Sequence, residues 1–257
     1  MELMKGFART VVTQFAAGTG LQLWPVRVRA GLAKGARWTL YPFSSNWRLG
    51  GEQDLEMAFN LLNPKAGAVC WDLGAHFGIY TVGFARQVGD KGQVYAFEPD
   101  PVAFARLQRH ARMNKLKNVK LFNIAASDRD GELKMIITGG LGSTVTHAKY
   151  EDELVSDQAE FLTSKCARLD TLVQSGEVRL PNFVKVDVEG HGAETLAGAV
   201  LSIKQSRPII ALSIHSPHEW EASRSLLQPL SYTPVIRAKT AGGWETPAAL
   251  ETIVLSA

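Results

Sequence analysis

The segment that most constrains the fold is AVCWDLGAHFG, at residues 68–78. An apolar run of strand length ends in an acid, Asp72, and two glycines follow at Gly74 and Gly78. Glycine permits tight turns, and a buried strand that turns tightly into a helix is how many α/β folds bind a nucleotide. The segment therefore predicts a nucleotide-binding turn at the carboxyl end of a strand.

The rest of the chain alternates between strand-like and helix-like patterns. We expect strands at 68–73, 93–99, 119–126, 132–138, 182–188, 208–214, 231–236 and 250–255, and helices at 77–88, 101–114, 168–175, 192–204 and 217–228. Residues 139–161 are rich in Gly, Ser and Thr and are expected to form a surface loop. This alternation predicts an α/β domain with a mostly parallel sheet and helices on both faces.

The N-terminal part has a different pattern. Residues 3–17 and 52–62 carry apolar residues at helical spacing, and 26–30 and 36–42 alternate like short strands. We expect residues 1–50 to be an extension that packs on a domain formed by residues 51–257. This extension is also a possible contact between copies in a homo-oligomer.

Composition indicates which binding partners and which cellular compartment to expect. The net charge is +3 with scattered basic residues, so no nucleic-acid partner is expected. The sequence lacks an apolar run of about 18 residues, so no transmembrane segment is predicted. Cys70 and Cys166 are far apart and outside any CxxC motif, which favours a reducing, cytoplasmic setting.

The details of the turn favour one cofactor class. Ala75 and His76 follow Gly74, so the G-x-G-x-x-G pattern of dinucleotide binding is missing. An acid ahead of the glycines suits a cationic group, such as the ammonium of an amino-acid moiety, better than a phosphate. Glu98 ends the next predicted strand, where an acid can accept hydrogen bonds from a ribose diol. These features indicate S-adenosylmethionine, with an NAD-dependent oxidoreductase as the alternative.

A second polar pattern lies in FVKVDVEGHGAETLAGA, at residues 183–199. Lys185, Asp187 and Glu189 have period-two spacing and point to one side of a strand. At the strand's carboxyl end the two acids would orient a substrate hydroxyl, act as a general base or help to hold a metal. Alternatively, Lys185 pairs with one acid and Glu189 caps the next helix.

Two further candidates sit near the predicted cleft. His215 follows the strand 208–214, and its ordinary pKa near 6.5 suits a general base, although a structural role is an alternative. Glu52 precedes the helix before the cofactor strand, where it either meets the cofactor's amino group or caps the helix. No trio of histidines and carboxylates has the spacing of a zinc site, so no metal is predicted.

Several motifs, in order, resemble one family. They are DLGAHFGIYT, FEPDP, AASDRDGEL, RLDTL and VKVDVEGHGAETLAGA. From about Glu52 to the C-terminus the chain resembles the FkbM family of S-adenosylmethionine-dependent methyltransferases. The resemblance implies the Rossmann-like class I methyltransferase fold, whose seven-stranded sheet has an antiparallel last strand. It also implies O-methylation of a hydroxyl on a sugar or natural-product small molecule.

The resemblance also implies site residues. For the cofactor these are Asp72, Gly74, Ala75, His76, Phe77, Gly78, Thr81, Glu98, Pro99, Ala126, Ser127 and Asp187. Asp187 and Glu189 match the signature beside the methyl group and, with His215, are the candidate catalytic residues. Gly192 departs from the family pattern, which has an acid at this position, while Glu194 comes two residues later. This departure leaves open a catalytically degenerate binding protein.

Overall fold

The computed structural model describes residues 25–39, 59, 64–138, 145–148, 160–237, 243–246 and 251–257. The predicted helix 3–17, nearly all of the predicted helix 52–62 and the candidate Glu52 lie outside the described residues. The division of the chain at residue 50 stays a prediction.

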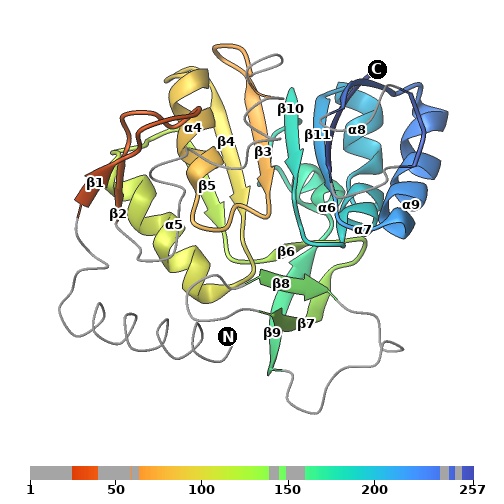
Figure 1. Ribbon diagram of the computed structural model, residues 1–257, viewed down its shortest axis with the longest axis horizontal. Coiled ribbons are helices and arrows are strands. Elements are labelled where there is room, and N and C mark those ends of the chain that lie inside the picture. Colours follow the sequence, from red (N-terminus) through yellow and green to blue (C-terminus); the bar gives the residue numbers. More distant parts are fainter. Residues whose placement is uncertain are drawn as a thin grey trace, which may run out of the picture.

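The centre of the molecule is a seven-stranded sheet in the order β12-β13-β11-β10-β3-β4-β5 (Figure 1). Its strands are β3 (Val69–Leu73), β4 (Gln93–Phe97), β5 (Val119–Phe122), β10 (Phe183–Val186), β11 (Ile209–Ile214), β12 (Thr233–Arg237) and β13 (Glu251–Ser256). The strands from β11 to β5 are parallel, whereas β13 runs antiparallel to both of its neighbours. The predicted sheet is confirmed.

Helices cover both faces of this sheet (Figure 1). They are α4 (Ile79–Val88), α5 (Pro101–Met113), α6 (Leu169–Gln174), α7 (Gly192–Ala197), α8 (Val200–Ser206) and α9 (Pro217–Leu227), which continues into the short η2 (Gln228–Leu230). Trp71 packs in the same apolar cluster as α6 to α9, and its neighbour Cys70 packs in the cluster that includes α4. Successive strand residues thus serve opposite layers, as a strand's period of two requires.

A smaller sheet in the order β6-β9-β7-β8 corrects two predictions. Its strands are β6 (Ala125–Ala126), β7 (Gly131–Thr138), β8 (Val145–Ala148) and β9 (Glu160–Ala167). The single strand predicted at 119–126 is therefore two strands in different sheets. The loop predicted at 139–161 was also wrong, because β8 lies within it and β9 begins at its end. Pairing with β7 forms these strands despite their polar composition.

The predicted helix 192–204 is also divided, into α7 and α8. Gly198 lies at the break, where an added Cβ would lie 1.8 Å from the carbonyl oxygen of Ser127. The close approach of this loop requires glycine and ends the first helix.

The described part of the N-terminal region is a hairpin that packs on α5. Its strands, β1 (Pro25–Arg27) and β2 (Arg37–Thr39), are antiparallel. Trp38 stacks on the imidazole of His110 with ring centroids 3.5 Å apart. The Nε2 of His110 lies 2.7 Å from Thr39 Oγ1, and Nδ1 lies 2.7 Å from the Phe77 carbonyl oxygen. One buried imidazole thus joins the hairpin to the loop that leads into α4.

Within the described part of the chain, no helix has the length and hydropathy needed to span a membrane. Both cysteines are buried and free.

We expect His110 to make folding pH-dependent. Burial lowers the pKa of His110 to about 4. Between that pH and the ordinary pKa of histidine, only the unfolded chain binds the proton, so the free energy of unfolding decreases as the pH is lowered. Urea unfolding at pH 7.5 and pH 5 should show about 2 kcal/mol less loss of stability in His110→Gln than in the wild type. Equal losses in the two proteins would contradict this role.

Candidate functional site

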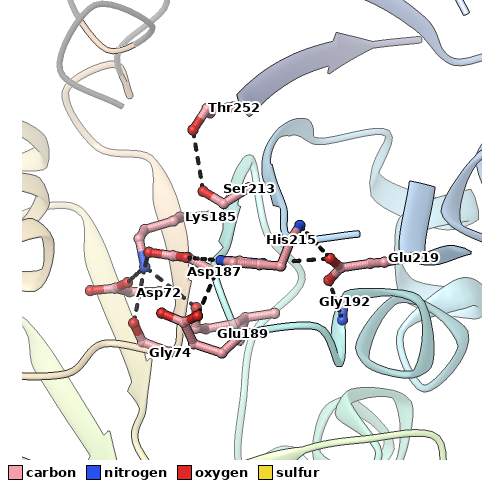
Figure 2. Close-up of polar contacts among 11 residues, drawn as sticks. Asp72, Gly74, Lys185, Asp187, Glu189, Gly192, Ser213, His215, Glu219 and Thr252 are labelled. Carbon is pink, nitrogen blue, oxygen red and sulfur yellow. Dashed lines mark hydrogen bonds and ion pairs between the residues drawn. The ribbon is translucent and has the colours of Figure 1, made fainter. Parts of the chain in front are cut away.

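A buried lysine lies at the centre of the candidate site. Lys185 of β10 is opposite Asp72 of β3 in register and is 1% exposed. Its Nζ lies 3.3 Å from Asp72 Oδ1 and 3.4 Å from Asp187 Oδ2, and it donates to the Gly74 carbonyl oxygen at 3.0 Å (Figure 2). The protein itself therefore supplies the cation beside Asp72 that sequence reasoning assigned to the cofactor.

Asp72 is fully buried, and Thr81 completes its environment. The Thr81 hydroxyl, also fully buried, donates to Asp72 Oδ2 at 2.5 Å. Phe77 is 4% exposed, and its carbonyl contacts the hairpin through His110. The structure therefore places Asp72, Thr81 and Phe77 as supports of the turn, and direct contact with a cofactor stays a prediction for each.

The turn uses its own amides internally. The N–H groups of Gly74 and Ala75 both donate to the Phe97 carbonyl oxygen, at 3.1 and 2.9 Å. The N–H of His76 donates to Glu98 Oε2 at 2.6 Å. A phosphate-binding loop presents such amides to its ligand, and here these three are occupied. The turn therefore differs from a pyrophosphate-binding loop, and its contact with the aminoacyl end of a cofactor stays a prediction.

Both glycines of the turn are required by the protein's own packing. Gly74 has φ of 75°, and an added Cβ would lie 1.8 Å from the Asp187 carbonyl oxygen. Gly78 has φ of 86°, and its Cβ would lie 2.3 Å from Leu107 Cδ1 on α5. A side chain at either position would separate β10 or α5 from the turn.

Glu98 directly follows β4, beside the turn, and is 5% exposed. Its Oε1 accepts from the Asp100 amide at 2.9 Å, and Pro99 is steadied by Asn123, whose Nδ2 donates to the Pro99 carbonyl oxygen. Burial raises the pKa of Glu98 to about 7, although the backbone amides of Asp100 and His76 lower it. An acid so placed can exchange protons near neutral pH.

The surroundings of Glu98 fit a nucleoside. The Nε2 of His76 is buried and has no hydrogen-bond partner among the residues that the structure describes. Burial lowers the pKa of His76 to about 4, so the ring is neutral at pH 7. A buried polar atom without a partner is rare in folded proteins and is satisfied when a ligand supplies the bond. The amide of the same residue bonds Glu98, and contact of either residue with a cofactor stays a prediction.

Ala126 ends β6 and Ser127 follows it, and both are buried. The Ala126 carbonyl accepts from Thr195 Oγ1 at 2.9 Å, and Ser127 Oγ lies 3.0 Å from His191 Nε2. Burial lowers the pKa of His191 to about 4. His191 thus connects the loop after β6 to the loop after β10.

The three candidate catalytic residues meet in space. Asp187 and Glu189 follow β10, and His215 follows the neighbouring strand β11. The His215 Nε2 lies 3.4 Å from Asp187 Oδ1 and 3.5 Å from Glu189 Oε2 (Figure 2). One donor atom from each residue lies within 4.8 Å of the others, so the group has the size to hold a metal ion. Chain spacing missed this proximity, because the pairing of β10 with β11 creates it.

Sequence reasoning also missed Glu219, in the first turn of α9. This carboxylate is 2% exposed and accepts from the amides of His215 at 2.7 Å and Gly192 at 2.8 Å. Its Oε2 lies 3.4 Å from His215 Nδ1. The four-residue spacing of His215 and Glu219 at a predicted helix start was the available signal.

The charged groups around His215 and Asp187 shift the pKa of both residues, which bears on the choice of a general base. Burial lowers the pKa of His215, but hydrogen bonds and charges from Asp187, Glu219 and Glu189 outweigh this effect and raise it to about 10. Burial likewise raises the pKa of Asp187, but Lys185 and His215 hold it at about 2. The expectation that His215 has its ordinary pKa was therefore wrong: the imidazole is protonated at pH 7 and must lose that proton before it accepts another.

The sheet order and its antiparallel β13 are those of the class I methyltransferase fold. A crystal structure of an FkbM methyltransferase from Methylobacillus flagellatus matches with a TM-score of 0.51 at 18% identity, over 77% of this chain and 45% of that one. An S-adenosylmethionine-dependent O-methyltransferase from Thermotoga maritima matches with a TM-score of 0.50 at 12% identity, over 91% and 77% of the two chains. These likenesses show the fold.

The family follows from sequence. Residues 72–238 match the methyltransferase FkbM domain. The chain is 31% identical over 191 residues to the hexuronic acid methyltransferase AglP of Haloferax volcanii, which covers 70% of this chain and 71% of that protein. It is 25% identical over 158 residues to the 2-O-methyltransferase NoeI of Sinorhizobium fredii, covering 57% of this chain and 63% of that one. The chain belongs to the FkbM methyltransferase family, as predicted, which sets the oxidoreductase alternative aside.

We expect Lys185→Met to destabilise the fold by about 3–5 kcal/mol, because it leaves Asp72 and Asp187 as buried charges without their cation. Chemical denaturation of the purified variant measures this loss. Lys165→Met, at an exposed position of β9, is the matched control and should change stability by less than about 0.5 kcal/mol. Similar losses in both variants would show that Lys185 has no special role.

Proposed function

We propose that this protein transfers the methyl group of S-adenosylmethionine to a hydroxyl group of a small molecule, a sugar being the favoured acceptor. The observation that carries the proposal is the position of Asp187. One carboxylate oxygen faces Lys185 beside the cofactor turn, and the other faces His215 in the polar group. Asp187 thus lies between the turn where the methyl donor would bind and the group of polar side chains that would hold the acceptor hydroxyl.

The donor side of the proposal rests on Glu98 and His76. S-adenosylmethionine supplies a methyl group already activated by a positive sulfur. The Glu98 carboxylate would accept hydrogen bonds from the ribose hydroxyls, and His76 Nε2 would gain the partner that it lacks among the described residues. Family membership supports this assignment independently.

The acceptor side rests on Asp187, Glu189 and His215. In the reaction the acceptor oxygen forms a bond to the methyl carbon, the carbon–sulfur bond breaks with its electron pair moving to sulfur, and the hydroxyl proton leaves. The ionised carboxylates would orient the hydroxyl and receive that proton. Most of the acceleration comes from alignment, because the donor is already reactive.

The class of acceptor is supported by the relatives. AglP is a hexuronic acid methyltransferase, and NoeI is a 2-O-methyltransferase. The alternative of a catalytically degenerate binding protein rests on Gly192 alone, because the family pattern has an acid there. In this chain the buried Glu219 carboxylate lies directly against that glycine. A cytoplasmic location and a homo-oligomer through residues 1–50 stay predictions.

The role of Glu98 is tested by calorimetry with S-adenosylhomocysteine. Glu98→Gln should bind at least tenfold more weakly, because it loses a charge-assisted acceptor for the ribose diol. Glu132→Gln, an exposed change on β7, should bind like the wild type. Unchanged affinity in Glu98→Gln would refute the cofactor assignment.

The same titration has a pH dependence. Because the pKa of Glu98 is raised to about 7, its acceptor form is lost as the pH falls through that value. Affinity for S-adenosylhomocysteine should therefore be lower at pH 6 than at pH 8 in the wild type, with a smaller change in Glu98→Gln. Identical pH profiles in the two proteins would exclude Glu98 as the titrating group.

The reaction is tested by incubating the protein with S-adenosylmethionine carrying a labelled methyl group and a panel of hexuronic acids, neutral hexoses and deoxyhexoses. We expect a methyl ether on at least one sugar, identified by mass spectrometry. Glu189→Gln should lower kcat at least tenfold and retain cofactor binding. Cofactor binding without transfer to any member of the panel would favour the degenerate binding protein.

A further inference from the structure

The group formed by Asp187, Glu189 and His215 has the dimensions of a metal site. The Nε2 of His215 lies 3.4 and 3.5 Å from the nearest carboxylate oxygens of the two acids. Three ligands on a tetrahedron with metal–ligand bonds of about 2.1 Å stand about 3.4 Å apart. Two of the three separations match this value, and the third is within 4.8 Å, so one ion would reach all three donors after a small adjustment of the acids.

Asp187 and His215 each contact a further charged residue outside the group, on the side away from the proposed ion. Lys185 contacts Asp187 through Oδ2, which leaves Oδ1 facing His215. Glu219 contacts His215 through Nδ1, which leaves Nε2 facing the two acids. Ligands of bound metals are typically oriented by such outer partners, a carboxylate behind a histidine above all.

The partner behind His215 is itself fixed and buried. Glu219 is 2% exposed, and its second oxygen accepts from the Gly192 amide at 2.8 Å. An added Cβ at Gly192 would lie 2.5 Å from Glu219 Oε1, so glycine at 192 makes room for this carboxylate. The orientation of the imidazole therefore depends on a buried acid, Glu219, and the proposed binding of acceptor and cofactor does not account for this acid.

The balance of charge also favours a cation. Asp187, Glu189 and Glu219 contact His215, and Lys185 is already shared between Asp187 and Asp72. Lys185 and the protonated imidazole of His215 thus face four carboxylates, including Asp72, and the group has an excess of two negative charges. A divalent ion bound by Asp187, Glu189 and the neutral imidazole would take the place of the imidazole's proton and add one further positive charge.

We propose that Asp187, Glu189 and His215 bind one divalent transition-metal ion at the carboxyl edge of β10 and β11. The mixed oxygen and nitrogen donors suit zinc, manganese or iron better than magnesium or calcium. Three protein ligands leave an open position, where an acceptor hydroxyl would bind and lose its proton more readily. Only this last role rests on the proposed function, because ion binding needs neither cofactor nor acceptor.

The test uses Co²⁺ as the probe, since its visible absorption reports bound ion directly. Tag-free, metal-stripped protein should bind one equivalent of Co²⁺, and Zn²⁺ should displace it. Glu189→Gln, in which the lost carboxylate is 35% exposed and therefore not needed for the core, should bind at least tenfold more weakly. Glu221→Gln, on the exposed side of α9, is the matched control and should bind like the wild type.

A second variant tests the outer partner. Gly192→Ala places a Cβ against Glu219 Oε1 and should weaken Co²⁺ binding about tenfold or more while all three ligands remain. Circular dichroism confirms that each variant is folded.

Calorimetry with S-adenosylhomocysteine, run on the same samples, separates the two proposals. Absence of saturable Co²⁺ binding, or equal affinity in Glu189→Gln and the wild type, would overturn the metal site even when cofactor binding is intact. If the wild type binds Co²⁺ but does not bind S-adenosylhomocysteine, the proposed function is overturned and the metal site remains supported.

Discussion

The structure depends on one buried cation. Lys185 is almost fully enclosed, and its ammonium group lies between Asp72 on β3 and Asp187 after β10. Either acid alone would carry a large desolvation cost, and so would the lysine alone, although its charge has the opposite sign. Their combination allows two adjacent strands to bring charge to the edge of an apolar sheet, and the cofactor turn and the acid–imidazole group are both attached to it.

The turn shows how local chemistry and packing agree. Its amides bond to Phe97 and Glu98, and its glycines admit the backbone of Asp187 and the side chain of Leu107. The turn is therefore shaped by its contacts within the protein before any ligand arrives. Such preorganisation lowers the conformational cost of binding a small molecule.

Much of this was predictable from sequence, and the failures have physical causes. Hydrophobic periodicity located the strands of the main sheet and the helices between them, since burial on one or both faces imposes the period. It missed β8 and the separation of β6 from β5, because pairing with β7 and β9, rather than composition, determines them. Period-two spacing found Lys185, Asp187 and Glu189. It did not find Glu219, whose role comes from the packing of α9 against the loop after β10.

The contact between Gly192 and Glu219 has a consequence for how relatives of this chain are classified. The family pattern places an acid at residue 192, and here an acid from α9 lies against the glycine, with too little space for both side chains. In this chain, therefore, an acidic side chain at residue 192 and the present position of the Glu219 carboxylate exclude each other. A sequence search that demands an acid at residue 192 would therefore pass over this chain, although a buried carboxylate lies beside that position.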